Sequence, residues 1–371
     1  MERVQSIFGD YATKLQALVD VRMDKFKVPF FQRYFGMGTP QMTLTYANII
    51  GRSRIEAAAS VVAHGAASPL RSRAGLETLS GKVAAIKVKR PMDEEQVRNY
   101  MTLQAMPVSD EAKKMQILRY IWEDVVYVGN AVIARIDYMA AQALNKGVIS
   151  INTTTNPDGV VPGDIDLLVS TSQKGVVGGT NENRQWSETN ATTMKVITDI
   201  KTIVRAQAKK GIRYEKILIH PEKLWEVLES TQVINLIKGL KVVTAGEIDL
   251  DLATVNTYMK IHGLPIFETV DVYTAVEKNG IVTTVEPWDK RYITFVPAGP
   301  QGQIHNSMAI EELKPVAAVS YAKYMNALIS KWSETEPYNE YTRGEISAFP
   351  GLETADSIYI LDTGSHTTYG G

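Results

Sequence analysis

The 371-residue sequence predicts an α+β protein whose subunit is flat or elongated. A helical pattern of about 36 residues begins near Ser109 and would extend roughly 54 Å, which is as wide as a compact sphere of this chain length. Residues 71–90 predict a long hairpin with few large apolar side chains, so it cannot have a core of its own. After Gly147 the pattern changes to an α/β unit followed by closing strands. A long helix and a coreless hairpin together indicate a subunit that relies on neighbours.

The amino-acid composition argues against several classes of function. Apolar residues make up 44% of the chain and charged residues 22%, which is typical of a folded soluble protein. The net charge of -1 argues against binding to nucleic acid mainly by phosphate neutralisation. Cysteine is absent, which excludes disulfides, thiolate metal sites and a cysteine nucleophile. The longest apolar stretch, residues 117–144, is interrupted by charged residues, so we expect no membrane span and no membrane partner.

The segment before Gly51 has irregular apolar positions and predicts an arm. A helix is expected over Val4–Val21, followed by an aromatic run at Phe30–Phe35. Strict alternation predicts a strand over Val83–Arg90 that stops at Pro91. Because the two ends of the chain lack strong apolar periodicity, we expect both termini to be ordered only by neighbouring subunits.

The long helix has Ser109 as its N-cap and apolar residues at helical spacing, and it ends at Gly147. A second helix is expected over Thr193–Lys210. The strand Lys216–Ile219 then leads into a helix opened by His220 and Pro221. Further strands are expected at residues 265–270, 281–285, 292–295, 316–324, 326–332 and 357–361.

No active site is evident in the sequence. The five histidines are scattered, and no catalytic or phosphate-binding motif occurs, so we expect no cofactor. Two Asp-x-Asp pairs, Asp164 with Asp166 and Asp249 with Asp251, would place both carboxylates on one face of a strand, where a divalent cation could bind. The same spacing is common on the solvated side of a half-buried strand, and we favour that interpretation.

Six basic residues and one acidic residue, Glu77, lie between positions 71 and 90. This basic run can be a solvated hairpin face, a phosphate-binding surface, or a contact with acidic surfaces of neighbouring copies. Phosphate binding is the weakest of the three because no aromatic residues are interleaved. Inter-subunit contact is favoured because a coreless hairpin exposes backbone edges that a neighbour would cover. The candidate contact residues are Arg71, Arg73, Lys82, Lys87, Lys89 and Arg90.

Local motifs support a family resemblance over nearly the whole chain. The strongest are Val62–Gly65, Ser68–Gly75 and Ile86–Pro91, with weaker support from Phe31–Phe35 and Ile217–Glu222. With the order of arm, loop, long helix and α/β unit, the chain resembles the tailed-bacteriophage major capsid fold and, within it, the lambda-type capsid protein E family.

The resemblance implies five regions with defined roles. These are an N-terminal arm (1–50), an extended β-hairpin loop that lies across an adjacent subunit (51–105), a peripheral domain with the spine helix (106–187), an axial α/β domain (188–315), and the closing strands and tail (316–371).

It also implies a structural protein, not an enzyme, that self-assembles as hexamers and pentamers into the icosahedral head shell of the virion. The shell would enclose double-stranded DNA without sequence-specific binding. Implied partners are a portal and a decoration or scaffolding protein, with assembly in the host cytoplasm. The alternatives are an encapsulin-like nanocompartment shell or a metal-dependent enzyme that uses Asp164 and Asp166.

Overall fold

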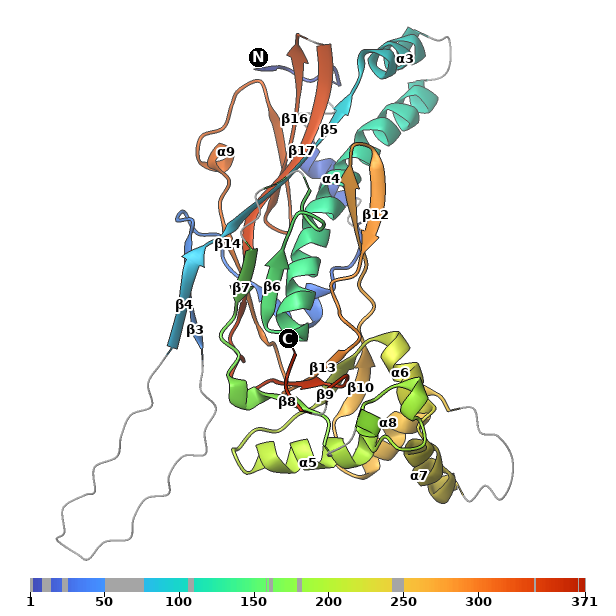
Figure 1. Ribbon diagram of the computed structural model, residues 1–371. Coiled ribbons are helices and arrows are strands. Elements are labelled where there is room, and N and C mark those ends of the chain that lie inside the picture. The colour runs from blue at the N-terminus through green and yellow to red at the C-terminus, as the bar shows by residue number, and fades with distance from the viewer. Residues whose placement is uncertain are drawn as a thin grey trace, which may run out of the picture. The chain divides into compact units, whose positions relative to one another are not determined.

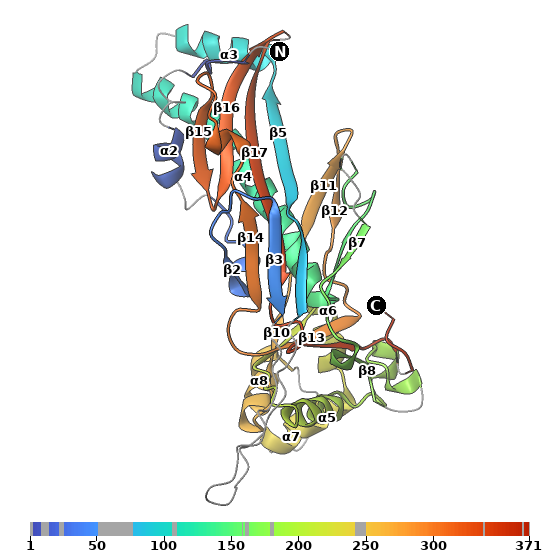
Figure 2. The same ribbon diagram turned by 90° about the vertical axis from the view of Figure 1, so that its left-hand side faces the viewer.

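The chain divides into two compact units, which are described separately (Figures 1 and 2). Unit 1 comprises residues 1–46, 80–137 and 303–350, and unit 2 comprises residues 47–79, 138–302 and 351–371. The structure is a computed structural model that describes residues 3–8, 15–21, 26–50, 77–105, 110–157, 159, 163–178, 182–241, 250–336, 338–365 and 367–370.

Unit 1 is built on a seven-stranded sheet with the order β1-β16-β17-β14-β2, in which β15 also pairs with β16 and β5 with β17. The long strand β17 is its centre, because it pairs in antiparallel register with both β16 and β5. The strands are β1 (Arg3–Val4), β2 (Phe35–Met37), β5 (Ala84–Met92), β14 (Gly302–Ser307), β15 (Ser320–Tyr324), β16 (Ala327–Thr335) and β17 (Tyr338–Leu352).

The long helix predicted from the sequence is confirmed as α4 (Asp110–Asn145), which has 36 residues. The shorter helix α3 (Glu94–Ala105) precedes it. Within unit 1, β17 approaches α4 so closely that a Cβ atom on Gly344 would lie 2.7 Å from the backbone oxygen of Val128. Only glycine fits there, because real Cβ atoms do not come that near a carbonyl oxygen.

The helix expected over Val4–Val21 is correct only in its last part, where α2 (Leu15–Val21) forms. Arg3 and Val4 instead form β1 and pair with Glu334 and Ser333 of β16. The open backbone edge of β16 offers hydrogen bonds to this segment, and such tertiary pairing overrides a local helical pattern.

Unit 2 contains a mixed five-stranded sheet with the order β10-β9-β13-β18-β8. The strand β9 (Lys216–Ile219) has the predicted bounds, and Pro221 opens helix α6 behind the N-cap His220. Trp186 and the apolar faces of the helices form one buried cluster with the sheet. The remaining elements are β8 (Lys174–Val176), β10 (Ile266–Thr269), β13 (Tyr292–Val296), β18 (Tyr359–Asp362), α5 (Val196–Ala208), α6 (Pro221–Leu228), α7 (Thr231–Lys241) and α8 (Leu252–Ile261).

The described residues also form three two-stranded ribbons. They are β3 (Thr45–Ile50) with β4 (Glu77–Lys82), β6 (Val148–Ile151) with β7 (Gly163–Asp166), and β11 (Thr274–Lys278) with β12 (Ile281–Val285). Short helical turns occur at η2 (Phe31–Arg33), η3 (Thr171–Gln173), η4 (Glu182–Arg184), η5 (Glu188–Asn190) and α9 (Ile310–Leu313). None of the described helices combines the length and apolar character needed to cross a bilayer.

The expectation that only neighbours order the termini is wrong for the described end segments. Near the C-terminus, the buried Asp362 accepts hydrogen bonds from Arg291 at 2.6 Å and from the backbone N–H of Gly370 at 3.1 Å. The ring of Tyr369 lies 5.6 Å from that of Tyr292. Polar tethering of this kind leaves no apolar periodicity in the sequence, which is why the pattern did not predict it.

Asp137 of α4 is a half-buried carboxylate whose ionisation opposes folding. Its Oδ1 accepts a 2.8 Å hydrogen bond from the backbone N–H of Phe31, which tethers the arm to the helix. Burial raises the pKa of Asp137 to about 6, and the Phe31 hydrogen bond opposes this shift only in part. The unfolded chain binds fewer protons than the folded chain between pH 4 and pH 6, so stability falls as pH rises through this window.

We expect Asp137→Asn to remove this pH dependence while retaining an oxygen that accepts the Phe31 N–H. The free energy of unfolding of the unsubstituted protein should fall relative to that of the variant by at most about 3 kcal/mol between pH 4 and pH 7. Urea denaturation of both proteins across this range measures the difference. Parallel stability curves would contradict the assignment to Asp137.

Candidate inter-subunit contact surface

The candidate contact residues that the structure describes lie on β4 and β5. Lys82 ends β4, and Lys87, Lys89 and Arg90 lie on β5. All four are exposed. Arg71 and Arg73 lie outside the described residues.

On β5 the basic side chains have partners within their own chain. Lys87 is paired in register with Glu345 of β17, and its Nζ lies 2.7 Å from Oε1 of that residue. The Nζ of Lys89 lies 3.8 Å from the ring centroid of Tyr341. Because β5 is a full strand of the unit 1 sheet, the prediction of a coreless hairpin is wrong for residues 84–90. The prediction that the strand stops at Pro91 is also wrong, because β5 continues to Met92 and Pro91 is paired in register with Tyr341 of β17. The half-buried Ile86 and Val88 alternate with the lysines and give this strand an inner face.

Arg90 extends this charge pattern toward α4. Its guanidinium lies 3.3 Å from Asp124 Oδ1 and 4.8 Å from the ring centroid of Tyr127. Burial raises the pKa of Asp124, whereas Lys331 and Arg90 favour its ionised form. Arg90 therefore compensates a buried acid of its own unit.

Beneath this surface is a buried ion pair that the sequence patterns did not reveal. Lys331 of β16 and Glu340 of β17 are fully buried, with 3.6 Å between Nζ and Oε1. Lys331 donates a 2.8 Å hydrogen bond to Thr342, and Glu340 accepts from the hydroxyls of Ser6 and Ser333. Burial lowers the pKa of Lys331 and Glu340 opposes this effect. Lys331 stands in the apolar strand Ala327–Trp332, and that position is the only sequence signal of its burial.

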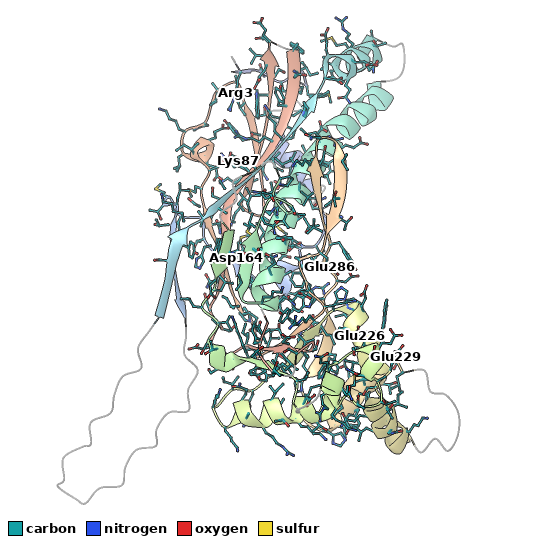
Figure 3. All side chains as sticks on the ribbon, viewed as in Figure 1. Arg3, Lys87, Asp164, Glu226, Glu229 and Glu286 are labelled. Carbon is teal, nitrogen blue, oxygen red and sulfur yellow. The ribbon has the colours of Figure 1, made fainter. Side chains whose placement is uncertain are left out.

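The three described aspartates of the Asp-x-Asp pairs belong to no cluster of metal ligands among the described residues. Asp164 and Asp166 are exposed on β7, and Asp166 accepts a 2.9 Å hydrogen bond from the backbone N–H of Leu168 (Figure 3 labels Asp164). Asp251 caps α8 by accepting from Thr254 N–H at 2.8 Å, and Asp249 lies outside the described residues. Among the residues that the structure describes, no group of three or more His, Asp or Glu side chains could hold a metal ion.

A family model described as phage major capsid protein E matches residues 21–362. The chain belongs to the phage major capsid protein E family. It is therefore a structural major capsid protein of a bacteriophage virion, and the predicted α+β tailed-phage capsid fold is confirmed. No curated protein matches the chain.

One solved structure agrees with the family at the level of fold, and two others are more distantly similar. A prophage protein of Escherichia coli CFT073 that is described as a capsid protein is 14% identical, with a TM-score of 0.58, over 98% of this chain and 99% of that one. A phage-related protein of Bordetella bronchiseptica RB50 is 10% identical over 98% and 99% of the two chains, with a TM-score of 0.48. The capsid of Myoviridae phage XM1 is 10% identical over 90% of each chain, with a TM-score of 0.45.

The charge reversals Lys82→Glu and Lys87→Glu should separate contact residues from residues that stabilise the capsid subunit itself. Lys87→Glu places a second carboxylate directly against the buried Glu345 and should lower the free energy of unfolding by about 1–2 kcal/mol. Lys82 lies at an exposed strand end, so Lys82→Glu should change the free energy of unfolding by less than about 0.5 kcal/mol. Urea denaturation of the free subunits tests this, and equal effects of the two reversals would contradict it.

Proposed function

We propose that this capsid protein assembles as hexamers and pentamers into an icosahedral head shell that encloses double-stranded DNA. The observation that carries the proposal is the match of one capsid family model to residues 21–362, which includes nearly all of both units. Within the shell, residues 51–105 would be the extended loop, residues 106–187 and 316–371 the peripheral domain, residues 188–315 the axial domain, and residues 1–50 the arm.

The charge balance of the N-terminal arm favours a shell into which a motor packages the DNA, because the arm lacks the excess of basic residues needed to condense DNA. The first 30 residues carry five basic and four acidic side chains, so this arm has almost no net charge with which to bind phosphates. We infer that the genome is enclosed without sequence-specific binding. The further partners in this proposal are a portal and a decoration or scaffolding protein, with assembly in the host cytoplasm and no membrane contact.

We assign no catalytic role to the chain. Its strongly desolvated carboxylates serve packing: Asp137 holds the arm, and the buried Asp199 accepts hydrogen bonds from Trp186 Nε1 at 3.1 Å and from Arg184 at 2.7 Å. Burial raises the pKa of Asp199, and these two donors oppose it. A carboxylate whose oxygens are occupied by an indole and a guanidinium is a structural group.

Negative-stain electron microscopy of the purified subunit tests the function. Hollow, closed particles of uniform size are expected. The variant Asp164→Asn/Asp166→Asn should form the same particles, because neither carboxylate has a place in the proposal. A subunit that stays monomeric under all assembly conditions, or that loses particles on this double substitution, would contradict it.

We expect Arg71→Glu/Arg73→Glu to leave the subunit folded but to prevent assembly or make it strongly dependent on salt. If the extended loop lies on a neighbouring subunit, these charges would meet carboxylates there, and like charges at an interface cost several kcal/mol. Circular dichroism reports the fold, and sedimentation across a series of ionic strengths reports the shells.

The charge-preserving variant Arg71→Lys/Arg73→Lys is the control and should assemble. Normal shells of the reversed variant at every salt concentration would identify the part of the loop around Arg71 and Arg73 as a solvated face. Loss of the folded subunit would show that this loop has a role in the core.

A further inference from the structure

The β11–β12 ribbon of unit 2, drawn in orange in Figure 1, presents an open strand edge. Its turn is Asn279–Gly280, with φ of 51° and 77°, and Lys278 is paired with Ile281 across it. Residues that flank such a two-residue turn form a hydrogen-bonded pair, and the pairs then alternate along the ribbon. The backbone groups of Val282 and Thr284 are therefore directed away from β11, to the outer edge of β12.

This edge lacks the usual protection against pairing with another chain. The sequence of β12 is Ile-Val-Thr-Thr-Val, with no charge and no proline, and Ile281 and Val282 are 71% and 63% exposed. Edge strands are normally blunted by charges, proline or a covering segment. Within the described part of the chain, β12 pairs only with β11.

Another edge in the same chain shows what protection looks like. The backbone N–H of Lys323 on β15 donates to the side-chain oxygen of Gln16 at 2.6 Å, and its carbonyl accepts from the Gln16 amide at 3.3 Å. The Gln16 side chain thus takes the place of a neighbouring strand. No comparable group covers Val282 or Thr284 among the described residues, although β12 has the higher content of strand-forming residues.

We propose that β12 pairs in antiparallel register with β12 of a second copy of this chain, with the two Thr283 residues opposite each other. In this register Val282 of each copy lies opposite Thr284 of the other copy. The outward-directed backbone N–H and C=O groups of these residues are then all hydrogen-bonded. The arrangement is self-complementary and two-fold symmetric. It produces a four-stranded sheet from two ribbons that are marginal alone.

The charges at the ends of β12 fit the same register. Glu286 follows β12 directly and would lie opposite Gly280 of the second copy, next to Lys278 of that copy (Figure 3 labels Glu286). The carboxylate of Glu286 also contacts His220 of its own chain, so Lys278 of the second copy would join an existing pair at each end of the contact. No like charges face each other at its centre. Pairing at β12 is small compared with the about 1,000 Å² expected for a stable interface, so it would act together with other contacts in a shell. The inference thus rests on the proposed self-assembly.

Because the chain has no cysteine, a single substitution can test this contact. Opposed residues of a non-hydrogen-bonded antiparallel pair have Cβ atoms about 4.5–5.5 Å apart, which is near disulfide range. Thr283→Cys should therefore form a covalent dimer of twice the 41.1 kDa subunit under mild oxidation, in shells and in concentrated free subunit. The control Ala275→Cys, exposed on the other edge of the ribbon, should give at least fivefold less dimer.

A second pair of variants tests the edge itself on the Thr283→Cys background. Ala275 and Thr284 are cross-strand partners, so their side chains lie on the same face of the ribbon. The backbone N–H and C=O groups of Thr284 point to the outer edge of β12, whereas those of Ala275 point to the outer edge of β11. Adding Thr284→Lys should lower the dimer yield at least fivefold, whereas adding Ala275→Lys should leave it unchanged. Circular dichroism of both variants controls for folding.

Equal dimer yields from Thr283→Cys and Ala275→Cys, or no dimer from Thr283→Cys, would overturn the pairing even if closed particles form. Absence of particles with efficient Thr283→Cys dimers would leave the pairing intact and contradict the proposed shell function.

Discussion

The close contact between β17 and α4 is the constraint on which unit 1 depends. Gly344 brings the strand against the backbone of Val128, so at this position the backbone of the sheet approaches the backbone of the helix directly. Both β16 and β5 are paired in register with β17. The contact between β17 and α4 therefore also fixes where these two neighbouring strands lie relative to the helix. Asp137 on the same helix then holds the arm through the backbone of Phe31. A single close approach thereby organises segments that lie more than 200 positions apart in the sequence.

Although the net charge is only -1, several charged side chains form ion pairs within the subunit. The Lys331–Glu340 pair is buried between the strands and is completed by hydroxyl groups from β16 and the N-terminal segment. Buried pairs of this kind contribute little net stability, but removing one partner is costly because the other charge stays desolvated. The docking of the N-terminal segment, in which Arg3 and Val4 pair with β16 and Ser6 donates to Glu340, is therefore coupled to the hydrogen bonding of this pair. Lys87 and Arg90 likewise compensate acids of their own chain, and Lys89 lies over the ring of Tyr341. The remaining candidates for contact with neighbours are Lys82, Arg71 and Arg73.

A shell protein must expose surfaces that join copies while it prevents uncontrolled association. The chain has one strand edge that is covered and one that is open. Gln16 covers β15 with a side-chain amide, whereas the exposed and uncharged β12 remains available. Since the contact at β12 is small, it would become significant only when other interfaces hold the copies together, which limits association of the free subunit.

Periodic patterns in the sequence determined the long helix, the strand Lys216–Ile219, the cap at His220 and the alternating part of β5 up to Arg90, because each depends on residues close together in the chain. Family motifs determined the class of protein. Only the tertiary structure decided that Arg3–Val4 is a strand, that residues 84–92 belong to a sheet, and that Lys331 is buried beside Glu340. The physical reason is that strand pairing and charge burial depend on partners up to 334 positions away (Ser6 with Glu340), and local periodicity carries no information about such partners.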